Sequence, residues 1–441
     1  MAVTPSLNSL PYEIRQTIYS LVGRQTGDSG YWRGNSAPTI AHYATVSREW
    51  QEAFEGFTFR ELRVTPKRLK SFSHIVTSPR RRAIVQTIHF HVSLDRYEPH
   101  LGGEQESSAE RRRGTEVLTA ALGSFFRVMT NWRKSDTSPL GLDLHLLVDS
   151  PSDSSTLTGK NGGPMVTGRA LTSYLKLDLE TLSLPHIDVF SGLRCTGRHL
   201  QPTSILAIVS RLRTLEYLDV ELNHDSTRKR DVKQRNNFAM GLDQHGETVR
   251  VLSLRRPSPM LTPSPSPPKQ PWSDFYVYMR NFSQQCESFE FDDCIDAAQF
   301  FAPFLVGPAT EKSLQGQDVP FWIRLKRLNV RNSYMMKAPY LRVANRIEAL
   351  ASVHKVLVAI GRAACRMPDL LFARVCQYVL SDGQLEWFVL TYECYAGKAV
   401  LRAKGFILGR AMTEAWKHCA ASKGLGFVVH NETDDPAAPE L

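Results

Sequence analysis

The sequence contains no uninterrupted apolar stretch that approaches the length of a membrane-spanning helix. Its first residues, MAVTPSLNSLPYEIRQ, lack the basic start and long apolar run of a secretory signal peptide. The seven cysteines are odd in number and show no C-x-x-C spacing, so the sequence predicts neither a disulfide framework nor a zinc finger. We therefore expect no membrane insertion, and a location in the cytoplasm, the nucleus or both.

Motifs of common catalytic sites are also missing, since neither G-x-S-x-G nor H-E-x-x-H occurs. Residues 163–170 (GPMVTGRA) have the glycine spacing of a phosphate loop, but Arg169 and Ala170 replace the Lys and Ser or Thr that contact phosphate and magnesium. His89 and His91 would share one face of a strand, yet no third metal ligand is evident nearby, so a pair without metal is the favoured interpretation. The sequence predicts no catalytic residue, no metal and no cofactor.

Neither sign of charge strongly dominates. The 441 residues include 54 Lys and Arg against 44 Asp and Glu, and the resulting net charge of +10 is weak evidence for a nucleic-acid partner. Basic runs at 66–70, 79–82, 110–113 and 227–235 lack interleaved aromatics, which favours solvated surface over nuclear-import signals. A hydrophobic content of 42% is typical of a folded protein, and the length allows two or three domains or one solenoid.

Two short helices are expected near the N-terminus. A first helical stripe begins after Leu10 and Pro11, with Ile14, Ile18, Leu21 and Val22 on one side. Residues 23–38 are rich in Gly and Ser and predict a loop, and a second stripe then runs from Ile40 to Phe54. Two helices of this size bury too little surface to be stable alone, so one stripe must pack on the rest of the chain or on a partner.

The segments LPYEIRQTIYSLV and HYATVSREWQEAF resemble the F-box, whose pattern begins Leu-Pro-x-Glu-Ile/Leu and ends Val-Ser-Arg/Lys-x-Trp. The match covers residues 8–55 and departs from the family in the long loop at 23–38. The following segments FRELRVTPKRLKSFSHIV and RRRAIVQTIHFHV resemble those that trail the F-box in many fungal members. Without the resemblance, the residues alone allow a local helical hairpin packed on the downstream domain.

The resemblance implies that this segment docks on the Skp-type adaptor of cullin-RING ubiquitin ligases, through an apolar helix face laid into a groove of the partner. The residues expected to make this contact are Leu10, Pro11, Ile14, Ile18, Leu21, Val46 and Trp50.

A six-residue pattern, apolar-x-x-apolar-x-apolar, recurs in the rest of the chain as LETLSL (179–184), LEYLDV (215–220), VRVLSL (249–254), CESFEF (286–291) and LKRLNV (325–330). The starts advance by 36, 34, 37 and 39 residues, and this near-even spacing carries more weight than any single copy. Segments 203–213 and 236–246 between copies have helical character, so each unit is expected to be strand, loop and helix, as in an irregular leucine-rich-repeat solenoid. Asn223 and Cys294 stand where the fuller repeat motif has Asn or Cys, and segments 83–92 and 139–148 are candidate earlier strands.

Three segments are expected to be loops from their composition, at 98–114, 150–164 and 257–271. Residues 341–364 predict an amphipathic helix ended by Pro368, and segments 370–380, 385–395 and 398–406 predict successive strands, followed by a helix that stops at Gly424. The sequence thus predicts an α/β protein with an F-box (8–55), a connecting segment (56–82), an irregular leucine-rich-repeat-like domain with parallel strands (83–365), a small mixed α/β unit of strands plus helix (366–424) and a polar tail (425–441).

The repeat pattern also predicts a register, because alternate residues of a strand point to opposite faces. The pairs expected to face the core are Leu218/Val220, Leu252/Leu254, Phe289/Phe291 and Leu328/Val330. Neighbouring parallel strands would then place Glu221, Arg255, Asp292 and Arg331 in one outward row of alternating sign. The residues expected to face a substrate are Tyr217, Asp219, Glu221, Arg255, Glu290, Asp292, Arg327 and Arg331.

These features favour the substrate receptor of a Skp-cullin-F-box ubiquitin ligase, a non-catalytic subunit that works by proximity. One end would bind the adaptor, and through it the cullin, while the other would bind an unidentified protein substrate. The alternative is a basic nucleic-acid-binding or assembly scaffold without a ligase role, although the acidic residues of the outward row make a poor surface for phosphate. An enzyme is the third hypothesis.

Overall fold

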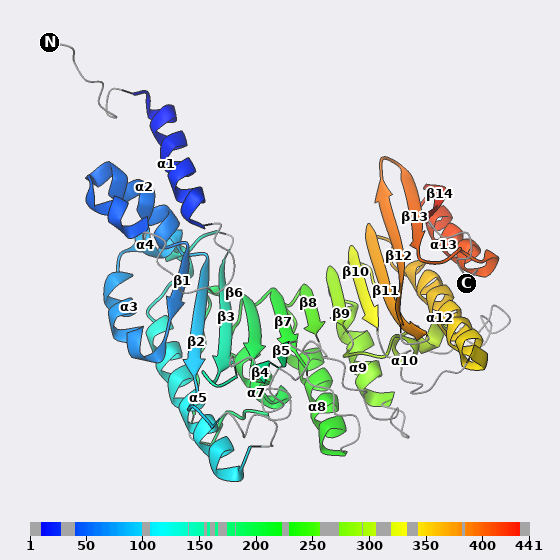
Figure 1. The fold of residues 1–441 in the computed structure, drawn as a ribbon, viewed down its shortest axis with the longest axis horizontal. Helices are drawn as coiled ribbons and strands as arrows, with labels where there is room; N and C mark the ends of the chain where they lie inside the picture. The colour runs from blue at the N-terminus through cyan, green and yellow to red at the C-terminus, as the bar shows by residue number, and fades with distance from the viewer. Residues whose placement is uncertain are drawn as a thin grey trace.

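The computed structural model describes residues 10–27, 40–98, 106–139, 141–153, 157–158, 164–165, 174–180, 182–222, 229–255, 273–292, 294–305, 319–332, 343–381 and 384–432. In this part the chain is a mixed α/β structure built on one twelve-stranded sheet of order β1-β2-β3-β6-β7-β8-β9-β10-β11-β12-β13-β14. Only β12 pairs antiparallel with its two neighbours. All other pairings within this twelve-stranded sheet are parallel, and Figure 1 shows the strands side by side in a curved sheet with most helices on one side.

The N-terminal helices are α1 (Tyr12–Gly27), the 3-10 helix η2 (Ile40–Thr45) and α2 (Arg48–Thr58). The predicted loop at 23–38 is wrong at its start, because α1 continues to Gly27. The second stripe is also two elements rather than one. Ser47 interrupts it in an extended conformation, and its hydroxyl accepts the Trp50 backbone N–H at 3.3 Å as the N-cap of α2.

The next elements are β1 (Glu61–Val64), η3 (Pro66–Arg68), α3 (Leu69–Ile75), α4 (Pro79–Ile84), β2 (Thr87–Ser93), α5 (Ser108–Met129), η5 (Lys134–Asp136) and β3 (Leu142–Asp149). The segment 56–82 is therefore more than a connection, since β1 forms the first strand of the sheet. The predicted loop at 98–114 is wrong from Ser108 onward. Ser107 and Glu110 form a capping box that starts α5, with the Glu110 N–H donated to the Ser107 hydroxyl at 3.2 Å.

The repeating part contains β6 (Phe190–Gly197), α7 (Pro202–Val209), β7 (Tyr217–Glu221), α8 (Lys229–His245), β8 (Val251–Arg255), α9 (Ser273–Ser283), β9 (Ser288–Asp292), α10 (Ala297–Phe300), η6 (Ala302–Phe304) and β10 (Arg327–Asn332). Four of the five predicted copies coincide with β7, β8, β9 and β10. The copy at 179–184 is wrong, because residues 179–180 form a turn. The strand at this place is β6, and the Asp178 N–H is donated to the Thr119 hydroxyl of α5 at 3.1 Å.

The C-terminal elements are α12 (Val343–Ala364), β11 (Phe372–Ser381), β12 (Gln384–Tyr395), β13 (Lys398–Lys404), α13 (Arg410–Ser422) and β14 (Gly426–Glu432). The predicted helices and strands of this unit are confirmed, and Gly424 follows α13 with φ +68°. The polar tail at 425–441 is wrong for its first part, because β14 pairs with β13. β10 pairs with β11, so the sheet is continuous across residue 365.

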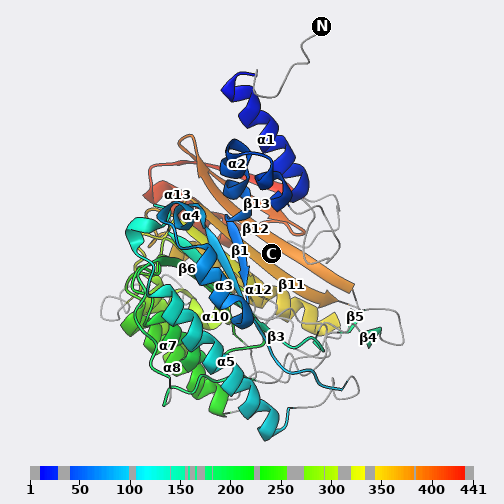
Figure 2. The same cartoon turned by 90° about the vertical axis from the view of Figure 1, so that its left-hand side faces the viewer.

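Apolar side chains on one face of the sheet pack against the helices. The ring centroids of Phe90 in β2 and Phe125 in α5 lie 4.4 Å apart, and those of Tyr392 in β12 and Trp416 in α13 lie 4.9 Å apart. All eight side chains predicted to point inward from β7 to β10 are buried. Figure 2, a view turned by 90°, shows the helices that pack on this face stacked along one side of the strands. The opposite side, which we call the open face, carries the alternate residues of each strand.

The predicted loop at 257–271 and Asn223 lie outside the described residues, as does most of the predicted loop at 150–164. Two short strands in that loop, β4 (Leu157–Thr158) and β5 (Pro164–Met165), pair antiparallel. Among the described residues, no helix combines the length and apolar character that crossing a bilayer requires.

Candidate functional site

The open face carries a polar row along the middle of the sheet. One residue from each of the twelve strands is in register with its neighbours, and no member of this row is apolar. The row consists of Arg63, His89, His145, Arg194, Asp219, Ser253, Glu290, Asn329, Arg374, Thr391, Arg402 and His430. Parallel sheets are usually covered on both faces, so a polar face of this length is the candidate interaction surface of the molecule.

All eight residues predicted to face a substrate lie on the open face of β7, β8, β9 and β10. The predicted register is confirmed, because Arg255 pairs with Glu221 on one side and with Asp292 on the other, and Asp292 pairs with Arg331. Arg331 Nη1 lies 2.9 Å from Asp292 Oδ2. The Arg327 guanidinium instead lies 5.5 Å from the centroid of the Phe372 ring.

Asp219 is the exception, because it lies on the open face but is only 1% exposed. Its carboxylate accepts hydrogen bonds from Arg194 Nε at 2.8 Å, from Arg255 Nε at 2.8 Å and from the Tyr217 hydroxyl at 3.0 Å. Burial and the charge of Asp219 raise the pKa of the Tyr217 hydroxyl. Asp219 therefore cannot contact a substrate as predicted; it holds Arg194, Tyr217 and Arg255 in place around it.

Three histidines of the open face, His89, His91 and His145, contact polar side chains of neighbouring strands. His89 Nδ1 and His145 Nδ1 lie 3.0 Å apart, and His145 Nε2 lies 3.0 Å from the Thr196 hydroxyl. Burial, then the neighbouring His89 and Arg194, lowers the pKa of His145 to about 4, so this ring is neutral at pH 7. His91 lies instead at 2.6 Å from Asp149. Within the described part of the chain, no group of three His, Cys, Asp or Glu side chains has the arrangement of a metal site.

A groove crosses the open face from β1 to β9. It consists of two hollows of about 220 and 510 Å³, which share Asp143, Arg194 and Tyr217 as lining residues. The first hollow extends toward His89 and Glu61, and the second extends toward Glu216, Arg250 and Glu287. Polar side chains of both signs line the groove, which suits recognition of a charged group more than burial of an apolar one.

A second row of charges lies immediately before the strands. Glu216, Arg250, Glu287 and Lys326 alternate in sign, and each backbone N–H in turn is donated to the carbonyl of the residue before it in this row at 2.7–2.8 Å. Lys326 Nζ also lies 2.8 Å from Glu287 Oε2. The sequence contained a signal for this row, since these residues occupy the second position of four successive hexapeptide copies.

The residues predicted to bind an adaptor lie on and beside α1 and α2, which stand beyond β1 at one end of the sheet (Figure 1). Five of the seven are exposed, namely Leu10, Pro11, Ile14, Leu21 and Val46. Ile14 and Leu21 share one side of α1 at helical spacing, Ile18 is half-buried on the same side, and Leu10 lies just before the helix. These exposed apolar side chains form a stripe at the N-terminal end of the molecule.

Trp50 is placed differently from the rest of that set. Its ring is half-buried. It packs edge-on against the Tyr19 ring, with the ring centroids 5.1 Å apart, and stacks on the Phe54 ring, with the centroids 5.3 Å apart. Tyr43 of η2 lies 5.2 Å from Phe54 and completes an aromatic cluster that joins α1, η2 and α2. Trp50 thus contributes to the packing of the helices more than to their exposed surface.

The basic run at 79–82 connects the N-terminal helices to the sheet. Arg81 of α4 lies 2.7 Å from the buried Glu55 of α2, and its guanidinium also lies 5.0 Å from the Phe59 ring centroid. Arg82 lies 3.0 Å from Asp136. Arg80 makes a longer contact to Glu52 at 3.4 Å. The expected solvated surface holds for the exposed Arg80, whereas Arg81 and Arg82 are half-buried, and all three arginines are in ion pairs.

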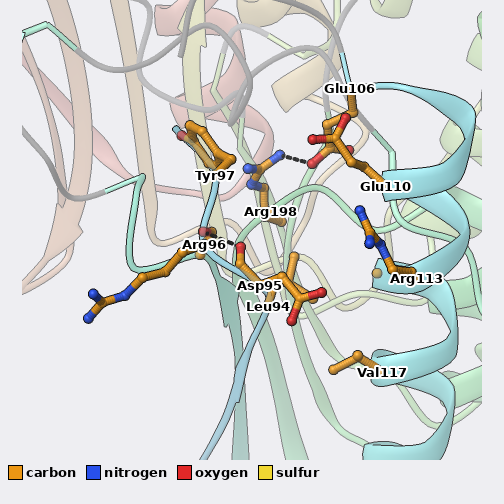
Figure 3. A pocket seen from close by; sticks show the side chains of 11 residues that line it. Leu94, Asp95, Arg96, Tyr97, Glu106, Glu110, Arg113, Val117 and Arg198 are labelled. Carbon is orange, nitrogen blue, oxygen red and sulfur yellow. Dashed lines mark hydrogen bonds and ion pairs between the residues drawn. The ribbon is translucent and has the colours of Figure 1, made fainter. Parts of the chain in front are cut away.

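A smaller cavity of about 50 Å³ lies at the carboxyl ends of β2, β3 and β6 (Figure 3). Arg198 lies at its base with its side chain only 1% exposed. Its guanidinium donates to both Asp153 oxygens at 2.8 Å and to Glu106 Oε1 at 2.7 Å. A cavity of this size holds one or two water molecules, so this network is a structural ion-pair cluster that fixes the strand ends.

The comparisons with known proteins do not assign the chain to a family. No family model matches it. A search of the curated proteins likewise finds no match. The function is therefore argued from the residues and their geometry.

Sequence reasoning missed most residues of the groove, including Asp143, His145 and Arg194. Arg194 was missed because the strand at this place was assigned to 179–184 rather than to β6. Asp143 and His145 lie on a predicted strand, and their alternation with buried leucines was the signal that they share the open face.

Proposed function

We propose that the protein is the substrate receptor of a Skp-cullin-F-box type ubiquitin ligase, acting in the cytoplasm, the nucleus or both. The observation that carries the proposal is the exposed apolar stripe of Leu10, Pro11, Ile14 and Leu21, on the segment whose sequence resembles the F-box. Exposed apolar side chains at helical spacing are the chemistry by which a helix docks in a partner groove. Val46, exposed beside the cap of α2, adds to this surface.

The finer architecture that we propose is an F-box followed by an irregular leucine-rich-repeat-like solenoid and a small mixed α/β unit. Parallel strands that recur every 34 to 39 residues with helices on one side support it. Cys294 adds support, because its thiol donates to the Leu254 carbonyl of the preceding unit at 3.1 Å. This contact joins two neighbouring units, and in a solenoid each repeat contacts its neighbours.

In this proposal the protein has no catalytic residue of its own. It binds a Skp-type adaptor, and through it the cullin, at the N-terminal helices, and it binds a protein substrate on the open face. The rate gain for the ligase comes from proximity, since the substrate is held near the transfer enzyme. A nucleic-acid scaffold is a weaker alternative, because the arginines at 80–82 are occupied by carboxylates.

The test is an adaptor pull-down with the double variant Leu10→Ala and Pro11→Ala. We expect binding to be abolished, because the anchors of the apolar contact are removed while the buried core is untouched. The thermal unfolding of the sheet should be unchanged. Gln16→Ala, on another side of the same helix, is the matched control and should bind as the wild type does. Undiminished binding by the double variant would contradict the assignment of the F-box.

A further inference from the structure

The groove on the open face has an excess of negative charge in a chain whose net charge is +10. Its lining contains four carboxylates, Glu61, Asp143, Glu216 and Glu287, against the two guanidinium groups of Arg194 and Arg250. The histidines add no positive charge at pH 7, because burial lowers the pKa of both His89 and His145. The groove therefore differs in sign from the molecule as a whole.

Internal pairing occupies one cation and one anion of this lining, so the excess of negative charge remains for an incoming ligand. Arg194 is held by the buried Asp219, and Glu287 is held by Lys326. Glu61 lies 3.9 Å from His89 Nε2. Within the described part of the chain, the Asp143 and Glu216 carboxylates have no ion-pair partner, although both are exposed and line the same hollow.

Gly192 allows the Asp143 carboxylate to lie close over the backbone of β6, near the Tyr217 ring. A Cβ atom at Gly192 would lie 2.1 Å from Asp143 Oδ1 and 3.5 Å from Tyr217 Cδ1. The Asp143 carboxylate thus occupies the place that a side chain at residue 192 would take, and it lines the same two hollows as the Tyr217 ring. A carboxylate next to an aromatic face binds an ammonium or guanidinium group by an ion pair and a cation–π contact together.

We propose that this groove binds a basic segment of a partner protein, with a Lys or Arg side chain in the hollow that Asp143 and Tyr217 line. Glu216, which lines only the second hollow, receives a second basic side chain. As a statement about the substrate class of a ubiquitin ligase, the inference rests on the proposed function. As a statement about binding, it stands on the charge and shape of the groove alone.

The experiment measures binding of the full chain to three pools of labelled peptides by fluorescence anisotropy. The pools share the same randomised flanks and differ only in a central pair, which is Arg-Lys, Gln-Gln or Glu-Glu. We expect the Arg-Lys pool to bind at least about fivefold more tightly than the Gln-Gln pool, with the Glu-Glu pool weakest, and the preference to shrink as salt is raised.

Two variants locate the effect in the groove. Asp143→Asn with Glu216→Gln removes the two unpaired charges and should reduce the Arg-Lys preference to within about twofold. Gly192→Ala keeps every charge but displaces the Asp143 carboxylate, which lies where the new methyl group would be, and it should reduce the preference as well. The control with the same change in net charge is Glu180→Gln with Glu414→Gln, two exposed carboxylates outside the groove. This control should keep the preference.

Equal binding of the Arg-Lys and Gln-Gln pools by the wild type would overturn the inference, and so would a preference that survives both groove variants. Either result leaves adaptor docking intact, because the Leu10 and Pro11 test does not involve the groove. Conversely, loss of the ligase assignment with a retained Arg-Lys preference would support the groove as a binding site for basic segments of some other partner.

Discussion

Replacing Asp219 with Ala should destabilise the protein more than any other single change on the open face of β7 to β10. The carboxylate is buried and accepts hydrogen bonds from Arg194, Arg255 and Tyr217. Removing it leaves two guanidinium groups next to each other without the charge that offsets their repulsion. The change therefore removes the attraction between Asp219 and the two arginines and leaves the repulsion between Arg194 and Arg255 uncompensated.

The magnitude follows from the burial of the partners. Loss of one member of a fully buried ion pair costs about 3–5 kcal/mol. The Arg194 and Arg255 side chains retain 44% and 35% exposure, so water replaces part of the lost interaction. We expect a loss of about 2–3 kcal/mol in the free energy of unfolding. With an unfolding entropy of about 2.1 cal/mol/K per residue, this corresponds to a fall in Tm of about 2–3 °C.

The assay is urea and thermal unfolding of Asp219→Ala beside Glu221→Ala, the matched control on the same face of the same strand. Burial raises the pKa of Glu221, and its removal should cost less than about 1 kcal/mol. The double variant Asp219→Ala with Arg255→Ala should lose less stability than the sum of its single variants. The reasoning is wrong if the two single variants at 219 and 221 are equally stable, or if the double variant is additive.

Two further predictions concern pH and the N-terminal helices. Stability should fall as the pH is lowered from 6.5 to about 4, because the unfolded chain then binds a proton at His145 that the folded chain does not; His145→Gln should flatten this slope in urea titrations, and an unchanged slope would refute the assignment. Trp50→Ala should cost about 2–3 kcal/mol locally and speed hydrogen exchange in α2, whereas the exposed Tyr12→Ala should not; equal exchange in both would argue against the aromatic cluster.

The sequence predicts much of the sheet because its strands obey a two-residue alternation that repeats at an even spacing. Leu218 and Val220 define β7, and the same pattern one unit later defines β8, so the register of Glu221 and Arg255 follows without any knowledge of contacts. Turn residues add the C-terminal boundaries, as Gly424 does after α13.

The prediction from sequence fails at segments whose apolar pattern or charged composition indicates a different element from the one that forms. LETLSL fits the strand pattern as well as the true copies do, but Leu179 lies in a turn, and the β6 segment is the one that lies beside β3. Residues 108–114 have the charge of a loop, but the Ser107 and Glu110 cap fixes them as the first turns of α5. In both cases the structure is decided by a specific contact, strand pairing in the first and helix capping in the second. A pattern of apolar residues does not show such contacts.

The charge pattern shows the same limit in the site itself. Alternating signs in the row of Glu221 and Arg255 predicted neighbours that pair side by side, and the strands do pair so. The Arg255 side chain, however, reaches diagonally to Asp219, a carboxylate that Arg194 from β6 also contacts. Arg194 lies on β6, the strand that the sequence pattern misassigned. Its contact with Asp219 thus changes which charges are paired and which carboxylates of the groove remain unpaired.

The connection between the two proposed binding surfaces decides whether a proximity mechanism is possible. A receptor that works by proximity gains effective concentration only if its two ends keep a suitable separation and orientation. The Arg81 contact to the buried Glu55 fastens α2 to α4, and Arg82 fastens α4 to Asp136 near the start of β3. The link from the apolar stripe to the sheet therefore runs through paired and partly buried charges rather than through a loop alone. A substrate bound in the groove would then be presented at a fixed position relative to the adaptor, as transfer to a lysine of that substrate requires.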